Sequence, residues 1–140
     1  MTAVRLGSGT PWEAVVGYSR VVASGDSAWV SGTTATVDGV VVHAGDAAGQ
    51  TRVALKTIAR ALADVGFGLA DVVRTRVYVT DISRWEEVGR VHGEFFARVR
   101  PATAMVQVAA LIDPAMLVEV EADAVRGSGG AGTAPRGPGA

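Results

Sequence analysis

Alternation of apolar and polar residues marks the strands that this chain is expected to form. The pattern predicts six strands, over residues 18–23, 27–32, 40–43, 72–81, 102–109 and 117–125. The clearest is "VVRTRVYVTD", which places on one face Val73, Thr75, Val77 and Val79. The third strand depends on the Asp-Gly turn in "VDGV", the strongest short-range hairpin signal.

Apolar residues that recur every three or four positions predict two helices. The first covers about residues 46–65 and can end at Gly66. The second begins near Ser83, which stands three residues before Glu86 in capping-box spacing, and stops before Pro101. The element order is therefore βββαβαββ, an α+β fold with a six-stranded mixed sheet. Because two helices are too few to cover both faces of such a sheet, we expect them on one face, with the other left for a partner.

One face of the last strand is an acidic row, which consists of Glu119, Glu121 and Asp123. The alternate residues are valine and alanine and suit packing beneath the helices. Because a turn joins the last two strands, we expect the row to lie opposite the preceding strand's Thr103, Met105 and Gln107. Arg74 and Arg76 could pair with the row, either inside a subunit interface or as loose surface ion pairs.

Composition limits the class of protein. The 140 residues suit one domain, and a content of 49% hydrophobic and 19% charged residues suggests apolar surface hidden against other subunits. A net charge of −1 provides no basic stripe for nucleic acid. No stretch is apolar for long enough to span a membrane, so we expect a cytoplasmic protein. With no cysteine and only two histidines, a metal site has too few ligands.

The chain ends in "GSGGAGTAPRGPGA", which is made of glycine, proline and small residues with a single arginine. Such a segment cannot bury enough apolar surface to offset the entropy lost on ordering. We therefore expect a single folded domain over residues 10–126 and a disordered tail over residues 127–140.

Glu119 is the leading candidate for chemistry. It stands between Val118 and Val120, and burial there would raise its pKa toward the range of a useful general acid or base. The alternative is a structural carboxylate paired with Arg74 or Arg76.

Hydroxyl groups and one histidine are the remaining polar candidates. Ser31, Thr33, Thr34 and Thr103 could orient water or a carbonyl, although hydroxyls in strands often bond only to nearby backbone. His92, on the apolar stripe of the second helix, is either a hydrogen-bonded core residue or a secondary acid-base group. The sequence contains no "GxSxG" elbow and no glycine-rich phosphate loop that joins a strand to a helix.

Several segments resemble the Rid (YjgF) family, the reactive-intermediate deaminases. They are "GYSRVV", "WVSGTT", "GDAAGQTRVALKTIARALADVG", "VVRTRVYVTDISRWEEVGRVHGEFF" and "RPATAMVQVAALIDPAMLVEVEADAV". The resemblance implies a chorismate-mutase-like α+β fold, assembled as a homotrimer with ligand clefts between subunits. It also implies hydrolysis of imines and enamines to a ketoacid and ammonia, without a metal or an organic cofactor.

The resemblance also assigns roles to single residues. The glutamate that positions or activates water matches Glu119, and Tyr18 matches a tyrosine at the cleft rim. The arginine that clamps the substrate carboxylate is expected after Pro101 and Ala102, where this chain has Thr103. A glutamine is likewise replaced by Thr33, so the chain resembles an arginine-less branch of the family. The candidate substrate-binding residues are Tyr18, Ser31, Thr33, Met105, His92 and Trp12.

These observations favour a cofactor-independent enzyme whose partners are a small-molecule substrate and two further copies of the chain. It would hydrolyse or tautomerise an imine, an enamine or a related conjugated carbonyl, as suits a specialised biosynthetic pathway. Glu119 would be the acid-base group, and Thr103 would hold the polarised oxygen or nitrogen. The alternatives are a non-catalytic trimer that binds a small metabolite and, third, an endoribonuclease.

Overall fold

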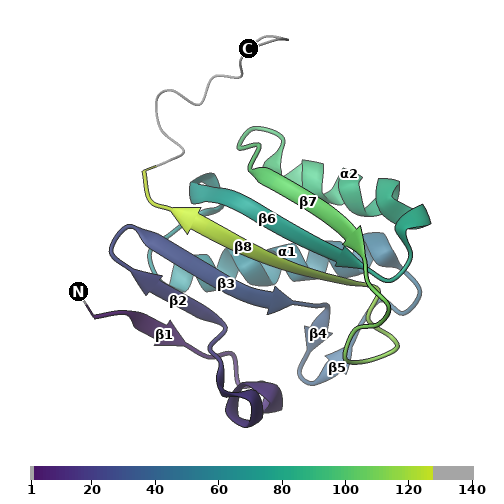
Figure 1. Ribbon diagram of the computed structural model, residues 1–140, viewed down its shortest axis with the longest axis horizontal. Helices are drawn as coiled ribbons and strands as arrows, with labels where there is room; N and C mark the ends of the chain where they lie inside the picture. Colours follow the sequence, from purple (N-terminus) through teal and green to yellow (C-terminus); the bar gives the residue numbers. More distant parts are fainter. Residues whose placement is uncertain (1, 128–140) are drawn as a thin grey trace.

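The main sheet has six strands in the order β1-β2-β3-β8-β6-β7. The computed structural model describes residues 2–127, and the strand bounds are Val4–Leu6 (β1), Val21–Ser24 (β2), Ser27–Thr33 (β3), Val118–Val125 (β8), Val72–Val79 (β6) and Ala102–Gln107 (β7). Neighbouring strands are antiparallel except for β6 and β7, which are parallel. The sheet is therefore mixed, as predicted (Figure 1). Except for Gly127, the tail predicted over residues 127–140 lies outside the described residues.

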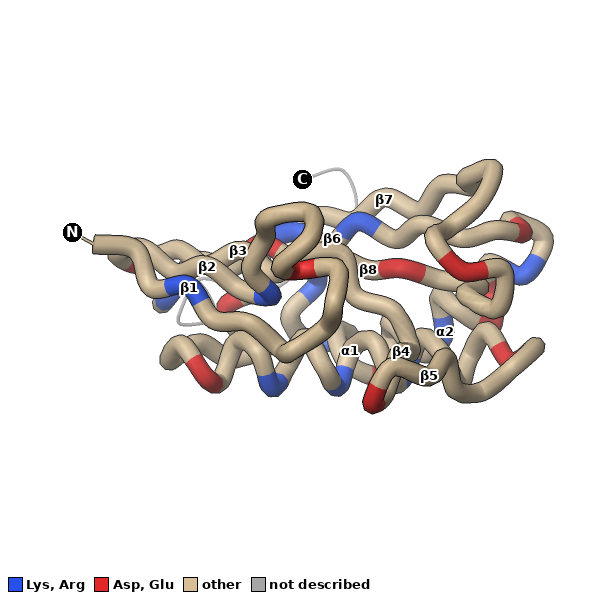
Figure 2. Tube along the Cα trace, turned by 90° about the horizontal axis from the view of Figure 1, so that it is seen from below, with Lys and Arg blue, Asp and Glu red and all other residues tan. Residues whose placement is uncertain are grey.

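Two long helices, α1 (Ala47–Asp64) and α2 (Trp85–Phe96), cover one face of this sheet and leave the other face open (Figures 1 and 2). α1 begins where the Asp46 side chain accepts a hydrogen bond from the Gly49 amide at 2.9 Å. Short single turns make up the rest of the helical structure, over Glu13–Gly17, Leu69–Asp71 and Ile82–Arg84. The predicted α+β architecture is confirmed.

The core lies between the helices and the sheet. Every second residue of β8 from Val118 to Ala124 is at most 1% exposed, and these side chains face Leu55, Ile58 and Leu62 of α1 within one cluster. The acidic row therefore lies on the open face, as the alternation predicted. Among residues 2–127 no helix combines the length and the apolar character needed to cross a membrane.

The predicted third strand of the sheet is wrong. The Asp-Gly turn closes a separate two-stranded hairpin, β4 (Thr36–Val37) with β5 (Val40–Val41), which does not join the main sheet. The sixth strand is instead β1, which pairs with β2 and begins before residue 10. A strand of three residues is too short to show a period of two, so the pattern gave no sign of it.

The predicted pairing of the last two strands is also wrong. β6 lies between β7 and β8, so the acidic row does not face Thr103, Met105 and Gln107. The cause is the crossover from β6 through α2, which returns β7 parallel to β6 at the edge of the sheet. Val73 departs from the expected face as well, because the register with β8 shifts between Val72 and Arg74 and leaves Val73 exposed.

A buried glutamine fixes the loop between β7 and β8. Gln50 of α1 is 0% exposed, and its amide nitrogen donates to the Ala115 carbonyl at 2.9 Å. Its amide oxygen accepts from the Leu117 backbone N–H at 2.8 Å. One side chain thus satisfies both backbone groups on either side of Met116 and sets the start of β8.

Replacing Gln50 with Ala should lower the free energy of unfolding by about 2–4 kcal/mol, because two part-buried backbone groups lose their partner and the fully buried side chain leaves a cavity. Urea denaturation monitored by circular dichroism measures this loss. Lys56→Ala, at an exposed position of the same helix, is the matched control and should change stability by less than about 0.5 kcal/mol. Equal stability of the two variants would show that Gln50 does not hold the loop.

Candidate functional site

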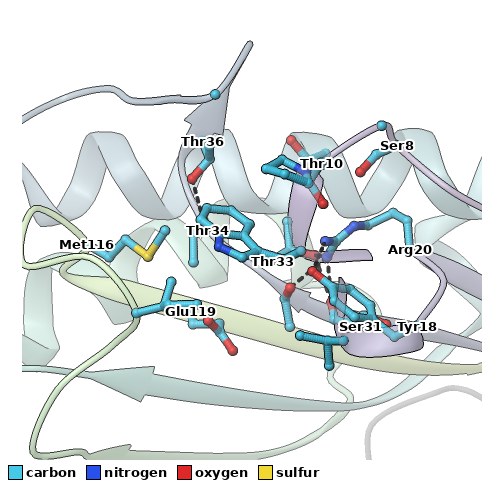
Figure 3. A pocket seen from close by; sticks show the side chains of 18 of the residues that line it. Ser8, Thr10, Tyr18, Arg20, Ser31, Thr33, Thr34, Thr36, Met116 and Glu119 are labelled. Carbon is cyan, nitrogen blue, oxygen red and sulfur yellow. Dashed lines mark hydrogen bonds between the residues drawn. The ribbon is translucent and has the colours of Figure 1, made fainter. Parts of the chain in front are cut away.

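A cleft with a volume of about 950 Å³ opens where β3 and β8 run beneath the N-terminal segment. Its walls come from residues 8–12, from β3 and the residues that follow it, from the loop before β8, and from β8 itself (Figure 3). Trp12, Tyr18, Ser31, Thr33 and Glu119 all line it. Five of the predicted site residues therefore meet in one cleft of a single chain.

A bulge in β3 shapes the floor of this cleft. Val30 pairs with Ala122 and Thr33 pairs with Val120, so three steps along β3 match two along β8. The extra residue lies at Ser31–Gly32 and turns the backbone toward the face that carries Glu119. A β-carbon built on Gly32 would overlap the Glu119 carboxylate. Only glycine allows this close approach of strand and carboxylate.

Glu119 is half-buried, and burial, followed by the nearby charge of Glu121, raises its pKa above the usual value. The charge of Arg20 opposes this rise only in part. The predicted source of the burial is wrong, because Val118 and Val120 point to the helix side of the sheet. On the open face, the β3 backbone at Gly32 lies close against the Glu119 carboxylate instead.

The other members of the acidic row have partners. Arg76 lies 3.6 Å from Glu121 and 3.3 Å from Asp123, and the Tyr78 hydroxyl donates to Glu121 at 2.7 Å. That hydrogen bond, with burial, raises the pKa of Tyr78. No hydrogen bond or ion pair holds the Glu119 carboxylate within the described part of the chain. Of the two arginines that the sequence offered as partners of the acidic row, Arg76 forms the ion pairs, and it forms them with Glu121 and Asp123. Glu119 is left available for a ligand.

Arg20 is a cleft residue that the sequence reasoning missed. It is 8% exposed, and its Nη1 donates to the Gly32 carbonyl at 2.6 Å, to Thr33 Oγ1 at 3.0 Å and to the Ser31 carbonyl at 3.3 Å. Figure 3 shows its guanidinium directed into the cleft beside Tyr18. The available signal was alternation, since Arg20 follows Tyr18 by two residues and so shares its face.

The hydroxyl groups of β3 are largely occupied by backbone. Ser31 Oγ donates to the Ser19 carbonyl at 2.6 Å, and Thr33 Oγ1 donates to the Ser31 carbonyl at 2.8 Å while it accepts from Arg20. These contacts hold the bulge and the arginine in place. Ser31 and Thr33 thus shape the cleft, and their hydroxyl protons are already committed.

Thr103, Met105 and His92 do not lie in this cleft. The β6–β7 register pairs Thr75 with Thr103 and Val77 with Met105, which puts all four on the helix side of the sheet. Thr75 Oγ1 lies 2.8 Å from both Thr103 Oγ1 and His92 Nε2. The predicted pairing of Thr103 with Glu119 within one chain is therefore wrong, because the parallel return of β7 reverses the face expected for Thr103.

His92 sits in an apolar setting. Its ring lies 4.7 Å from that of Phe96, and burial lowers its pKa, which favours neutral imidazole. Within residues 2–127 no group of three histidine, cysteine, aspartate or glutamate side chains is arranged to hold a metal ion.

Comparisons with known proteins indicate the family to which the chain is related. Residues 9–126 match the family model described as endoribonuclease L-PSP. An uncharacterized protein of Streptomyces coelicolor is 43% identical over 89% of this chain and 92% of its own length. The 3-aminoacrylate deaminase RutC of Acinetobacter baylyi is 40% identical over 57% of this chain and 63% of its own length.

A crystal structure from Mycobacterium tuberculosis supports the same relationship. It is described as a member of the YjgF/YER057c/UK114 family and is 52% identical, with a TM-score of 0.81 over 89% of this chain and 99% of that one. The family match over residues 9–126 and this structure together show that the chain belongs to the YjgF (Rid) family.

Proposed function

We propose that the protein is a cofactor-independent hydrolase that deaminates an imine or enamine of a small molecule. The observation that carries the proposal is the Glu119 carboxylate, which lies in the cleft against Gly32 without a hydrogen-bond or ion-pair partner among residues 2–127, with its pKa raised by burial. The 3-aminoacrylate deaminase among the relatives supports deamination as the class of reaction.

In the proposed reaction, protonated Glu119 donates its proton to the imine nitrogen. The resulting carboxylate accepts a proton from the water that adds to the imine carbon, so a C–O bond forms as the C=N bond becomes single. Glu119 then returns the proton to nitrogen and accepts the hydroxyl proton as the C–N bond breaks, which gives a carbonyl compound and ammonia and restores protonated Glu119. A raised pKa suits this cycle, because the group must hold a proton and release it near neutral pH.

RNA is a weaker substrate candidate, although the matching family model is described as an endoribonuclease. Figure 2 shows basic and acidic positions interspersed along the described part of the chain, without a continuous basic stripe over residues 2–127. Affinity for a phosphate backbone depends on such basic surface. The cleft, lined by Glu119, Glu121 and Asp38 with Arg20 as its one basic side chain among the described residues, suits a small molecule better.

The Glu119→Gln variant should lose about 10²–10⁴-fold in turnover, because glutamine cannot transfer a proton. The measurement is ammonia release above background from imines generated freshly by an amino-acid oxidase. Glu86→Gln, at an exposed position of α2, is the matched control and should retain full turnover. Retained turnover in Glu119→Gln would defeat the assignment. No turnover in the unmodified protein would favour a binding protein without catalysis.

Loss of folding cannot explain the expected loss of turnover. The folded state raises the pKa of Glu119, so ionisation of this group costs stability once the pH exceeds the unfolded-state pKa of about 4.3. Glutamine removes that cost. The free energy of unfolding of Glu119→Gln at neutral pH should therefore equal or exceed that of the unmodified protein, and the difference should shrink toward pH 4.

Gly32→Ala should displace the Glu119 carboxylate, because the added methyl group would occupy its position. We expect turnover to fall by about 10²-fold, the cost of an ångström-scale misplacement. Gly93→Ala is the control, since a β-carbon at this α2 position meets nothing within 4 Å. The control should keep turnover and gain about 0.5–1 kcal/mol in unfolding free energy. Full turnover in Gly32→Ala would contradict the role given to the close approach.

We propose that the protein acts as a homotrimer in the cytoplasm, with the open sheet face at the subunit contact. Trp29 and Val106 are each 47% exposed on that face, since Trp29 pairs with Asp123 and Val106 with Tyr78. Large exposed apolar side chains on an uncovered sheet are typical of an interface.

Sedimentation equilibrium should give a mass near three times the chain mass of 14.3 kDa. Trp29→Lys should lower this mass, because it puts a charge into the apolar contact. Arg60→Glu, on the exposed side of α1, should leave the mass unchanged. A monomer in the unmodified protein would disprove the trimer.

A further inference from the structure

We infer that Arg20 determines the specificity of the cleft and selects a ligand that carries a carboxylate. The inference deepens the proposed function and rests on it for the identity of the reacting group. Arg20 directly precedes β2. The family resemblance places the substrate-binding arginine elsewhere, at the position where this chain has Thr103.

Arg20 is built into the cleft wall as a fixed cation. Three hydrogen bonds from Nη1 to β3 hold the guanidinium, and two of them end on backbone carbonyls of the bulge. An arginine side chain stays charged in proteins, and the two carbonyls compensate for the water that this guanidinium has lost. The cleft therefore presents a positive group whose position does not depend on a ligand.

The second terminal nitrogen of the guanidinium, Nη2, has N–H donors available for a ligand. Nη2 lies 3.5 Å from the Tyr18 hydroxyl and 3.8 Å from a Glu13 carboxylate oxygen, which are long contacts, and no shorter one holds it within residues 2–127. Tyr18 also lines the cleft. Together they offer N–H and O–H donors to one small anion, the arrangement that charge-assisted recognition of a carboxylate requires.

Glu13 neutralises part of the charge without blocking this edge. Its carboxylate accepts from the Ser8 amide at 2.9 Å, from Ser8 Oγ at 2.5 Å and from the Gly9 amide at 3.3 Å. Burial alone would raise the pKa of Glu13, but these hydrogen bonds outweigh it and lower the pKa. Glu13 is thus an ionised group committed to the N-terminal loop, and a ligand need not displace it.

Arg20 and Glu119 approach the same residue from two directions. The Gly32 carbonyl accepts from Arg20, and the Gly32 Cα lies against the Glu119 carboxylate. An anionic group at Arg20 would therefore stand next to a C=N group at Glu119. This favours a small ligand that carries its carboxylate close to the reacting C=N group.

Two other acidic residues in the lining oppose an anion only weakly. Glu121 is bound by Arg76 and Tyr78, and Asp38 lies in the exposed turn of the β4–β5 hairpin. Solvent screens the charge of an exposed group, whereas the buried Arg20 acts at close range.

The test compares the full-length protein's affinity for pyruvate and for pyruvamide by isothermal titration calorimetry, which requires no turnover. The two ligands differ in charge and are similar in size. We expect pyruvate to bind at least about 10-fold more tightly, equivalent to about 1.4 kcal/mol. Arg20→Gln should abolish that preference, and Arg20→Lys should keep part of it. Arg52→Gln, which removes an exposed ion pair with Glu94 outside the cleft, should keep all of it.

Steady-state kinetics give a second readout. Arg20→Gln should raise KM for an anionic imine far more than for a neutral imine, while kcat changes less. Equal binding of pyruvate and pyruvamide by the unmodified protein overturns the inference, and this comparison holds even if Arg20→Gln does not fold. Retained preference in a folded Arg20→Gln also overturns it.

Different results would refute hydrolysis by Glu119 and carboxylate selection by Arg20. Ammonia release from anionic and neutral imines at equal efficiency would support hydrolysis and refute the role of Arg20. Pyruvate binding that depends on Arg20, without ammonia release from any imine, would support the anion site and refute hydrolysis.

Discussion

The close approach of the Gly32 backbone to the Glu119 carboxylate is the constraint on which the site depends. It exists because β3 carries one more residue than β8 between two fixed pairs, so the strand bulges toward the open face. The same bulge presents the Ser31 and Gly32 carbonyls to Arg20. A single irregularity in the sheet therefore buries an acid and anchors a cation beside it.

Regular pairing around the bulge divides the acidic row into two kinds of carboxylate. Glu121 lies opposite Arg76 in the antiparallel ladder of β6 and β8, Asp123 lies opposite Arg74, and Arg76 forms ion pairs with both carboxylates. Glu119 stands one step beyond this network, where the neighbouring residue on β6 is the neutral Tyr78. Burial, and after it the negative charge of Glu121, therefore raise the pKa of Glu119. The chemical difference among three similar residues comes from the register of the strands.

The spacing of apolar residues correctly predicted which face of each of these elements is buried. The alternating residues of β8 and the stripe of Leu55, Ile58 and Leu62 lie in the core as expected, because each pattern reports which face of its own element meets apolar surface. Periodicity does not report which strands are neighbours. It therefore could not show that β7 pairs with β6, or that Thr103 shares a face with the buried Thr75. Arg20 was missed for a related reason, since alternation with Tyr18 indicates its face but gives no sign of the carbonyls that bury it.

The position of the cation bears on how the site can vary among related chains. A carboxylate ligand requires a guanidinium at a particular point in space, and any backbone that passes that point can supply it. In this fold the approach to β2 runs beside the bulge, so an arginine at residue 20 gains carbonyl partners that the fold already provides. Thr103 is free to serve the helix side of the sheet, where it bonds to Thr75 within a network that reaches His92. The guanidinium can therefore come from Arg20 and not from the family position at Thr103. Binding of a carboxylate depends on where the guanidinium lies in space and not on its place in the sequence.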